Sequence, residues 1–573
     1  MKTSLLSFAF FTIVIVGFML KFGPDKRGKD TVYKQEEIPF CGQISSGNPG
    51  ITANGKFVMP LPGSGQYSYK ISTNNDSAQF YFNQGLTMYY SYHMKEALAS
   101  FMESSRFDTK HPMPYWGQAL AMGPYYNAAH SYQLPAAIPE IVSKMNQAAT
   151  YGNESENALI KAMTLRYSND LSDKNRKNLN ITYADAMKKL AISKTANMDA
   201  KALYVDAVML MHAWDFWNAD GSAKPWTQEL VMLCENILKT NPNHPAALHY
   251  HIHLTEASRN PEVALPNADK LKNLLPGVAH MVHMSSHEYQ RNGMYAKGVE
   301  VNDKADENLL RYDSLAPNLQ LNKHSTHYFA VQTYCAMSGG MYKTGMRDAL
   351  RCRKSVNPSP QQTYDQYMFM LPTLTLARLG KWDEILNDSI SPDPKWSYAA
   401  LLSNFAKGLA YANTNDLISA KKQLELLYQN SKDPILTKVR IPFNAPISMA
   451  NIAGEILNAT ILFSEKKYDE SFSSLNNAIK IEDNLVYTEP NDWPIPARQF
   501  LGAFLLKTGK YVLAEKVYRE DLALNPGNGW SLIGLSKSLK AQKKNSQLAS
   551  YKTKYMRAFS GADNLPNSSV YMK

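Results

Sequence analysis

Residues 499–526 read QFLGAFLLKTGKYVLAEKVYREDLALNP, and this stretch decides the fold. Its residues Gly502, Ala514, Tyr518 and Pro526 stand at positions 8, 20, 24 and 32 of a unit of about 34 residues. The two small residues let a pair of helices cross closely, and the large side chain packs against the next pair. The proline ends the unit, because its ring does not fit a continuing helix. The stretch therefore predicts a helix pair.

The same spacing returns in both halves of the chain. Good matches are Gly85, Ala97 and Phe101, and also Gly408, Tyr411, Ala420 and Leu424; a weaker match is Ser471, Leu475 and Ala478. No long stretch shows the two-residue period of a β-strand. The pattern is that of the tetratricopeptide repeat (TPR). It predicts an all-α protein, a right-handed helical solenoid of stacked TPR-type helix pairs with a concave face.

The N-terminus predicts export. Lys2 precedes an apolar run from Leu5 to Leu20, and Lys21 follows it. A positive end followed by such a run is typical of a secretory signal peptide, and the run is slightly short for a membrane-spanning helix. No small-residue cleavage site stands out, so a cleaved signal peptide and a retained membrane anchor both stay open. Either one predicts a protein in the periplasm, or one anchored in the membrane and facing outward.

Composition divides the chain into regions, because helical periodicity begins only at about residue 76. We expect residues 1–22 to be the signal peptide or membrane anchor, 23–75 a tether and extended lead-in, 76–345 a helical repeat region with the histidine cluster, 346–560 a C-terminal TPR region and 561–573 a tail. The lead-in is rich in Gly, Ser, Asn, Lys and Pro, which is typical of chain without helices.

Charge and cysteine content exclude several classes of function. The net charge of +11 is spread along the chain. We find no arginine-rich run and no alternation of aromatic and basic residues of the kind that stacks on nucleic acid. We therefore expect no nucleic-acid partner, and membrane contact only through the N-terminal segment. The four cysteines form no C-x-x-C pair, which argues against thiolate zinc; Cys335 and Cys352 either pair or are isolated buried thiols.

Histidines gather in the middle of the chain. Nine of the 13 lie between His244 and His327, and none follows His327. Three segments each place a stripe on one helix face: His249, His253 and Glu256; His280, His283 and His287; and His324 and His327. Because consecutive helices of a solenoid are neighbours, we expect the stripes to converge.

Converging imidazoles with a carboxylate suit a divalent transition metal such as Zn, Cu or Fe. The expected direct ligands are His253, Glu256, His283 and His287, with His249, His280 and His327 as alternates or as partners that orient the ligands. The alternative is a buried polar network in which the histidines satisfy one another.

Three further candidates stand outside these stripes or at their edge. Two of them, His93 and Glu96, lie one helical turn apart, and they join the cluster if the superhelix folds back. The third candidate is His324. His244 precedes Pro245, so we expect it to be a capping or turn residue rather than a metal ligand.

Two familiar metal motifs do not fit. His287 and Glu288 begin the zinc-protease pattern H-E-x-x-H, but position 291 is Arg. Ferritin-like sites use Glu-x-x-His, whereas here His253 comes before Glu256. The cluster therefore belongs to neither class.

Several blocks resemble a group of bacterial exported TPR proteins. They are QFYFNQGL (79–86), YHMKEA (92–97), YWGQALAMGP (115–124), the block 244–258, PGVAHMVHMSSH (276–287), DWP (492–494) and NPGNGWSL (525–532). The resemblance covers most of the chain from about residue 76 to 545. It implies the TPR fold and marks the histidine blocks as a family feature, but it implies no substrate. Ser286 departs from the group, which has Pro in the turn before the last histidine.

Three functions stay open. The leading one is metal binding at the cluster. In the second, an open position on the metal activates water or dioxygen, Glu256 acts as general base, and Trp214, Asp215 and Trp217 stand at the mouth of a substrate pocket. In the third, the concave face binds a protein or peptide and the histidines only pack. A buried histidine pocket favours metal, and an open coordination position favours catalysis.

Overall fold

The computed structural model describes residues 49–168, 172, 174–193, 197–438 and 444–572. These residues form 24 α-helices joined by turns and short 3-10 segments, and the only strand-like feature among them is one isolated bridge between Trp217 and Ala223. The all-α prediction is confirmed. The predicted signal peptide or anchor, and residues 23–48 of the predicted lead-in, lie outside the described residues.

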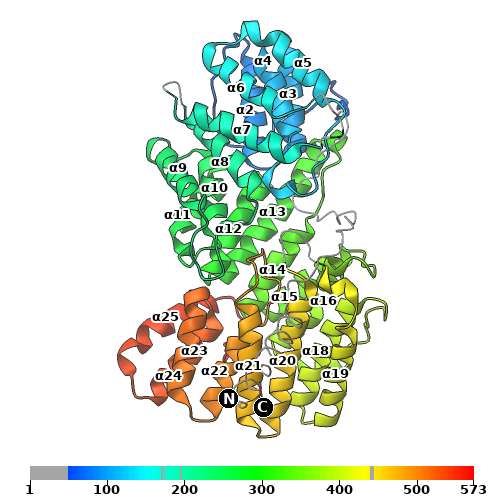
Figure 1. Ribbon diagram of the computed structural model, residues 1–573, viewed down its shortest axis with the longest axis vertical. Helices are drawn as coiled ribbons and strands as arrows, with labels where there is room; N and C mark the ends of the chain where they lie inside the picture. Colours follow the sequence, from blue (N-terminus) through cyan, green and yellow to red (C-terminus); the bar gives the residue numbers. More distant parts are fainter. Residues whose placement is uncertain (1–48, 169–171, 173, 194–196, 439–443, 573) are drawn as a thin grey trace, which may run out of the picture. The chain divides into compact units, whose positions relative to one another are not determined.

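The helices follow one another without a long break (Figure 1). In chain order they are α2 (Asp76–Tyr90), α3 (Met94–Phe107), α4 (Pro112–Ala121), α5 (Ile138–Ala148), α6 (Glu154–Leu165), α7 (Arg176–Ala191), α8 (Met198–Met211), α9 (Thr227–Thr240), α10 (Pro245–Thr255), α11 (Leu265–Leu274), α12 (Ala279–Arg291), α13 (Tyr295–Leu315), α14 (Thr326–Ser338), α15 (Tyr342–Lys354), α16 (Thr363–Arg378), α17 (Trp382–Leu386), α18 (Ser397–Asn413), α19 (Leu417–Asn430), α20 (Pro446–Ser464), α21 (Tyr468–Glu482), α22 (Ala497–Lys507), α23 (Tyr511–Leu524), α24 (Gly529–Ala541) and α25 (Leu548–Ala558).

Consecutive helices pack as pairs, and the pairs stack. Each helix contacts the next one along the chain, as α12 contacts α13 and α20 contacts α21. Most even-numbered helices also contact the next even-numbered helix, which places α10, α12, α14 and α16 in one row. Two rows of helices related in this way are the arrangement of a TPR-type solenoid.

The predicted small and large residues meet at the helix crossings. The ring of Phe101 lies between Gly85 and Gly117, where added Cβ atoms would stand 2.7 and 2.2 Å from it. Tyr518 lies in the same way between two glycines, Gly502 and Gly534, where added Cβ atoms would stand 2.3 and 2.1 Å from its ring. The aromatic residue at position 24 therefore fills the gap between one pair and the next.

Replacing Gly117 with Ala is expected to lower the free energy of unfolding by about 1–3 kcal/mol, because the new methyl group must displace the Phe101 ring. Gly50→Ala is the matched control, since its nearest neighbour would stand at an ordinary 3.7 Å. Urea unfolding followed by circular dichroism measures both variants. Equal midpoints for the two would show that the crossing has room to relax.

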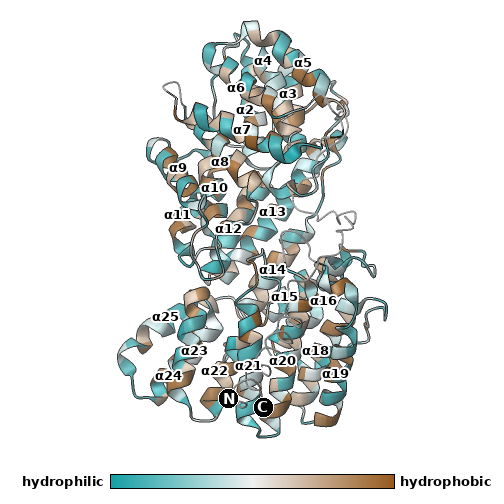
Figure 2. Cartoon of the chain, viewed as in Figure 1, coloured by the Kyte–Doolittle hydropathy of each residue, from teal (hydrophilic) through white to brown (hydrophobic). Residues whose placement is uncertain are grey.

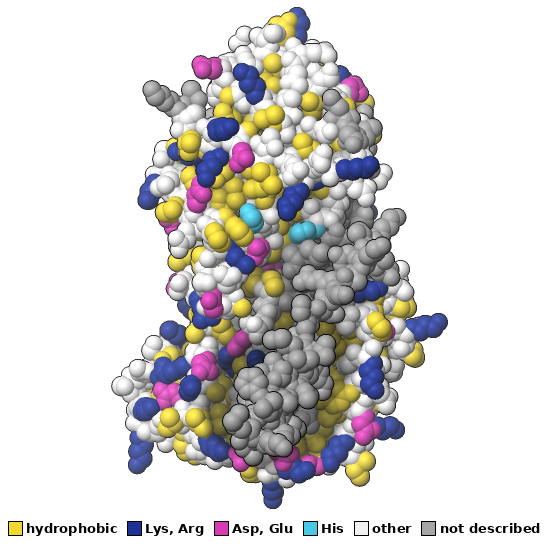
Figure 3. All heavy atoms as spheres, viewed as in Figure 1, with side chains coloured by type: hydrophobic (Ala, Val, Ile, Leu, Met, Phe, Trp, Pro, Cys, Tyr) yellow, Lys and Arg dark blue, Asp and Glu magenta, His cyan; other side chains and the backbone are white. Residues whose placement is uncertain are grey.

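Hydrophobic and hydrophilic residues mix along the helices (Figure 2), and on the face in Figure 3 the Lys and Arg side chains are scattered among Asp and Glu. One helix, α20, is apolar and long enough to cross a membrane by composition, but 56% of that window is buried, as in a core helix. The described cysteines Cys234, Cys335 and Cys352 are buried free thiols, so Cys335 and Cys352 do not pair.

Two irregular segments pack beside the middle of the helix row. In the described part of the lead-in, Val58, Leu61 and Ile71 are buried, and the Gly63 carbonyl accepts a hydrogen bond from Gly277 just before α12. The second segment is the α21–α22 loop, residues 483–496, which reaches back to α12 and α14. These contacts enclose the histidine-bearing helices.

Candidate metal centre

The histidines come from three neighbouring helices of one row. Helix α10 starts where the His244 side chain accepts a hydrogen bond from the Ala247 N–H, next to Pro245 in the first turn. The capping role expected of His244 is therefore confirmed. Helices α12 and α14 follow in the row and contact one another through the faces that carry their histidines.

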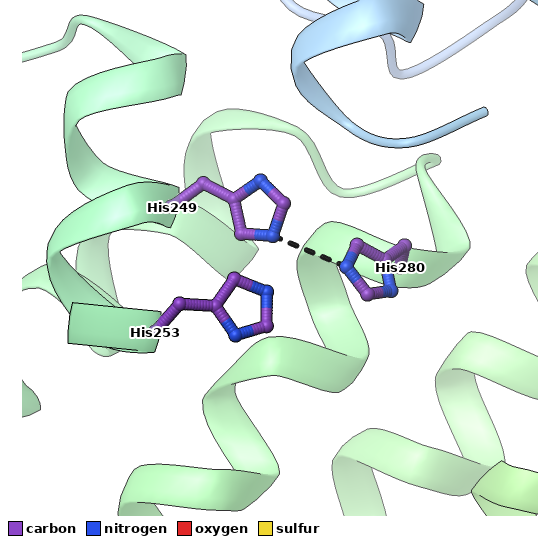
Figure 4. Close-up of side chains that lie close together, drawn as sticks. All are labelled: His249, His253 and His280. Atoms are coloured by element: carbon purple, nitrogen blue, oxygen red, sulfur yellow. Dashed lines mark hydrogen bonds between the residues drawn. The ribbon is translucent and has the colours of Figure 1, made fainter. Parts of the chain in front are cut away.

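The first group of histidines is triad 1, His249, His253 and His280. His249 and His253 lie one turn apart on α10, and His280 is in the first turn of α12. One ring nitrogen from each lies within 4.8 Å of the others. The Nε2 atoms of His249 and His280 are 3.1 Å apart, and Figure 4 shows the three rings converging from the two helices.

The second group is triad 2, His283, His287 and His327. His283 and His287 lie one turn apart on α12, and His327 is in the first turn of α14. Their ring nitrogens also lie within 4.8 Å of one another, and the Nε2 atoms of His283 and His327 are 3.1 Å apart. The ring of Tyr328 stacks on His283 with a centroid distance of 4.2 Å.

Two carboxyl groups connect the triads. Glu256 is hydrogen-bonded to His253 Nδ1 at 3.0 Å and lies 3.9 Å from His287 Nδ1. Glu489, from the α21–α22 loop, lies 3.3 Å from His287 Nε2. Glu256 and Glu489 also form, with His253, a third group of candidate ligands within 4.8 Å. We call Glu256 and Glu489 the acid pair.

The whole centre is closed off from solvent. The six triad histidines are at most 6% exposed, and Glu256 is 1% exposed. Tyr92, in the turn between α2 and α3, covers triad 1, with its ring centroid 4.6 Å from that of His249. Tyr92 has a φ of 56°, in the left-handed region that non-glycine residues rarely adopt. The same conformation recurs in the turns of other helix pairs, as at Asn415 and Lys466, so it belongs to the repeat.

Burial keeps the imidazoles neutral. It lowers the pKa of His253 and of His327 from 6.5 to about 4. Burial and then the neighbouring imidazoles lower the pKa of the other four triad histidines, His249, His280, His283 and His287, well below the usual range. A neutral imidazole offers a lone pair to a metal ion, whereas a protonated one does not.

Burial has the opposite effect on the carboxyl groups. It raises the pKa of Glu256 from 4.5 to about 8. The pKa of Glu489 is also well above its usual range, because of burial and then of the nearby Glu256. Glu288, beside His287 on α12, has a raised pKa for the same first reason. A cation beside Glu256 and Glu489 would favour the ionised forms of both carboxyl groups.

The residues present fit a metal ion. His249 Nδ1 donates to the Tyr90 carbonyl at 2.7 Å and His283 Nδ1 to the Asn302 side-chain oxygen at 2.6 Å, so each Nε2 carries a lone pair. His253 Nδ1 is hydrogen-bonded to Glu256, and its Nε2 has no hydrogen-bond partner. Partners of this kind orient the ligands in metal sites. Two nitrogens on one tetrahedral zinc ion lie about 3.3 Å apart, given Zn–N bonds of about 2.0–2.1 Å.

The structure brings together all seven main candidates, but it separates the four expected direct ligands. His253 belongs to triad 1, His283 and His287 belong to triad 2, and Glu256 lies between the triads. The four expected ligands therefore do not lie together around one point.

The additional candidates lie at the edge of the centre or apart from it. His93 bonds to Glu96 at 2.8 Å, and its Nε2 accepts a hydrogen bond from the His280 backbone at 3.3 Å. The fold therefore does turn back onto the cluster, but His93 contacts backbone there. His324 lies apart and bonds to Asp306 at 2.9 Å, with 48% of its side chain exposed.

The sequence interpretation missed Glu489, Glu288 and Tyr92. Glu489 stands far from the histidines in the chain, and its only signal was the neighbouring DWP block of residues 492–494. Glu288 directly follows His287 at the end of the block 276–287, and Tyr92 opens the block 92–97 just before His93.

A pocket lies beside the acid pair. It has a volume of about 310 Å³, and its lining includes Trp214, Asp215 and Trp217, the residues expected at the mouth of a substrate pocket. Arg291 and Thr488 also line it, and Thr488 directly precedes Glu489. The volume is at the lower end of the range for small-molecule sites.

Comparison with known proteins adds little to this geometry. No protein-family model and no curated protein matches the chain. Among solved structures, human IFIT1 with m7Gppp-AAAA is 12% identical over 86% of this chain and 92% of its own, with a TM-score of 0.31. Yeast Tom70 is 12% identical over 83% of this chain and 92% of its own, with a TM-score of 0.28. Likeness of this degree carries no inference about ligands, so the fold assignment rests on the helix pairs themselves.

Proposed function

We propose that this chain is an exported TPR-type repeat protein that binds a divalent transition metal in the centre between α10, α12 and α14. One observation carries the proposal: the buried Nε2 atom of His253 has no hydrogen-bond partner, and it lies beside the imidazoles of His249 and His280. A buried polar atom left unpaired costs free energy. A metal ion would remove that cost, and Zn, Cu and Fe all accept imidazole nitrogen.

The burial of the centre also supports metal over peptide binding. A peptide that bound to the histidines themselves would have to pass the α2–α3 turn and the α21–α22 loop, which both cover them. A surface open to a partner elsewhere on the repeat is compatible with the proposal. The histidines are as buried as the ligands of a metal site.

Replacing His253 and His283 together with Ala is expected to abolish metal binding, because it takes one ligand from each triad. The full-length protein, purified without a histidine tag, should contain near-stoichiometric metal by elemental analysis, and the double variant none. His324→Ala is the matched control, since His324 lies outside the centre. If neither the parent nor the control takes up Zn, Cu or Fe after supplementation while both stay folded, the histidines only pack.

The export part of the proposal rests on the apolar N-terminal run alone, from Leu5 to Leu20. Fractionation of cells that produce the protein tests it. Recovery of the chain in the cytoplasm, with its N-terminus intact and no membrane association, would contradict export and leave metal binding untouched.

A metal-dependent enzyme is the second candidate, and the pocket beside Glu489 favours it. The pocket borders the loop that carries Glu489, and three tryptophans, Trp214, Trp217 and Trp493, line it. Each triad supplies three nitrogens, so a four-coordinate ion would keep one position for water or substrate. Azide binding to the cobalt-loaded protein, seen as a change in visible absorption, would show an open position; an unchanged spectrum would favour metal carriage or a structural role.

A further inference from the structure

Triad 2 repeats triad 1 one helix pair later along the row. His249 and His253 are the fifth and ninth residues of α10, and His283 and His287 are the fifth and ninth residues of α12. The third member comes each time from the second residue of the next helix in the row, His280 in α12 and His327 in α14. The two triads therefore occupy equivalent positions of successive repeats.

The fifth-position histidine and the third member are also arranged alike in the two triads. In each, the fifth-position histidine donates through Nδ1 to an oxygen, the Tyr90 carbonyl in one and the Asn302 side chain in the other. Each places its Nε2 atom 3.1 Å from the Nε2 of the third member. Each imidazole pair is held by its own oxygen partner, and the two pairs have the same nitrogen–nitrogen distance. This indicates two metal sites rather than one site with additional histidines around it.

We propose that the chain binds two divalent transition-metal ions, one in each triad, as a tandem centre generated by the helical repeat. This inference rests on the proposed metal-binding function and names its stoichiometry and its ligands. The ligands are His249, His253 and His280 for one ion and His283, His287 and His327 for the other.

The array ends after two sites. Helix α14 carries Ala330 and Tyr334 at the fifth and ninth positions, and neither residue type replaces imidazole there. Before α10, the corresponding positions of α8 hold Ala202 and Asp206, and Asp206 accepts a hydrogen bond from Tyr89. The chain therefore provides two histidine triads in the row.

The acid pair belongs to both sites. Glu256 orients His253 of triad 1 and lies near His287 of triad 2, and Glu489 lies against His287. Both are positioning residues in this proposal. A change at Glu256 should therefore affect both ions, whereas a change at His249 or His327 should affect one.

Native mass spectrometry of the full-length protein counts the ions directly. The metal-stripped protein is loaded with Zn²⁺, desalted and weighed, and the parent is expected to carry two ions. His249→Ala and His327→Ala should each carry one Zn²⁺ ion. The variant that combines these two substitutions should carry none, and the control His324→Ala should carry two. Circular dichroism establishes that each variant is folded.

The outcomes separate the two proposals. One ion in the parent would overturn the tandem centre and keep the metal-binding function. This result does not depend on whether the variants fold. Loss of all metal in both folded single variants would likewise show one shared site. No ion in a folded parent would overturn both the tandem centre and the metal-binding function.

Discussion

The metal-free protein is expected to be most stable near pH 6.5 and to lose stability on both sides of that value. The acid side comes from the six buried triad histidines. Each has a pKa below the unfolded value of about 6.5, so its stabilising contribution is complete above that pH and is lost as the pH falls toward the folded value. For His253 and His327, whose folded pKa is about 4, the loss is about 3 kcal/mol each.

The alkaline side comes from Glu256, Glu288 and Glu489. Their folded pKa is raised, so their contribution is complete below the unfolded value of about 4.5 and is lost as the pH rises through the folded value, about 8 for Glu256. Between about pH 4.5 and 6.5 both effects act, and the histidines outnumber the carboxyl groups. Stability therefore rises with pH up to about 6.5 and falls beyond it.

Urea unfolding of the chelator-treated protein at pH 5, 6.5 and 8 measures this profile. Glu489→Gln supplies the control, because it removes one carboxyl group and should flatten the alkaline decline while leaving the acid decline in place. A midpoint that is equal at pH 5 and pH 6.5 would mean that the histidines are not held neutral in the fold.

Much of the fold was accessible from local pattern. The small residues at Gly85 and Gly502 and the rings of Phe101 and Tyr518 predicted helix crossings, because a missing Cβ at one helix and a ring on the next are complementary in shape. The one-turn spacing within α10 and within α12 likewise placed His249 beside His253 and His283 beside His287, since helix geometry alone fixes those pairs.

The grouping of the histidines was not accessible in the same way. Whether His253 meets His280 or His283 depends on how far α12 slides along α10, and that offset is set by packing of the whole row. Glu489 approaches the centre from a loop whose path no periodicity describes, and Tyr92 approaches it from the turn of the first repeat. Tyr92 in particular adopts a left-handed backbone conformation that a helix-turn pattern assigns to glycine or asparagine.

Loading the protein with Zn²⁺ is expected to raise its free energy of unfolding by about 8 kcal/mol at a free metal concentration about a thousandfold above the dissociation constant. Each site contributes about 4 kcal/mol under that condition, because the ion binds the assembled triad and not the separated histidines of the unfolded chain. His249→Ala and His327→Ala should each retain about half of the gain, which a single shared site would not allow.

The gain should also grow with pH, which ties it to the acid pair. In the metal-free protein the ionisation of Glu256 and Glu489 is opposed by burial, whereas two bound cations favour it. Metal should therefore remove the alkaline decline, and the difference between loaded and stripped protein should be larger at pH 8 than at pH 6.5. Urea midpoints at the two pH values test this, with His324→Ala as the control. An equal gain at both would mean that the carboxyl groups do not sense the ions, and that Glu256 and Glu489 serve the fold rather than the centre.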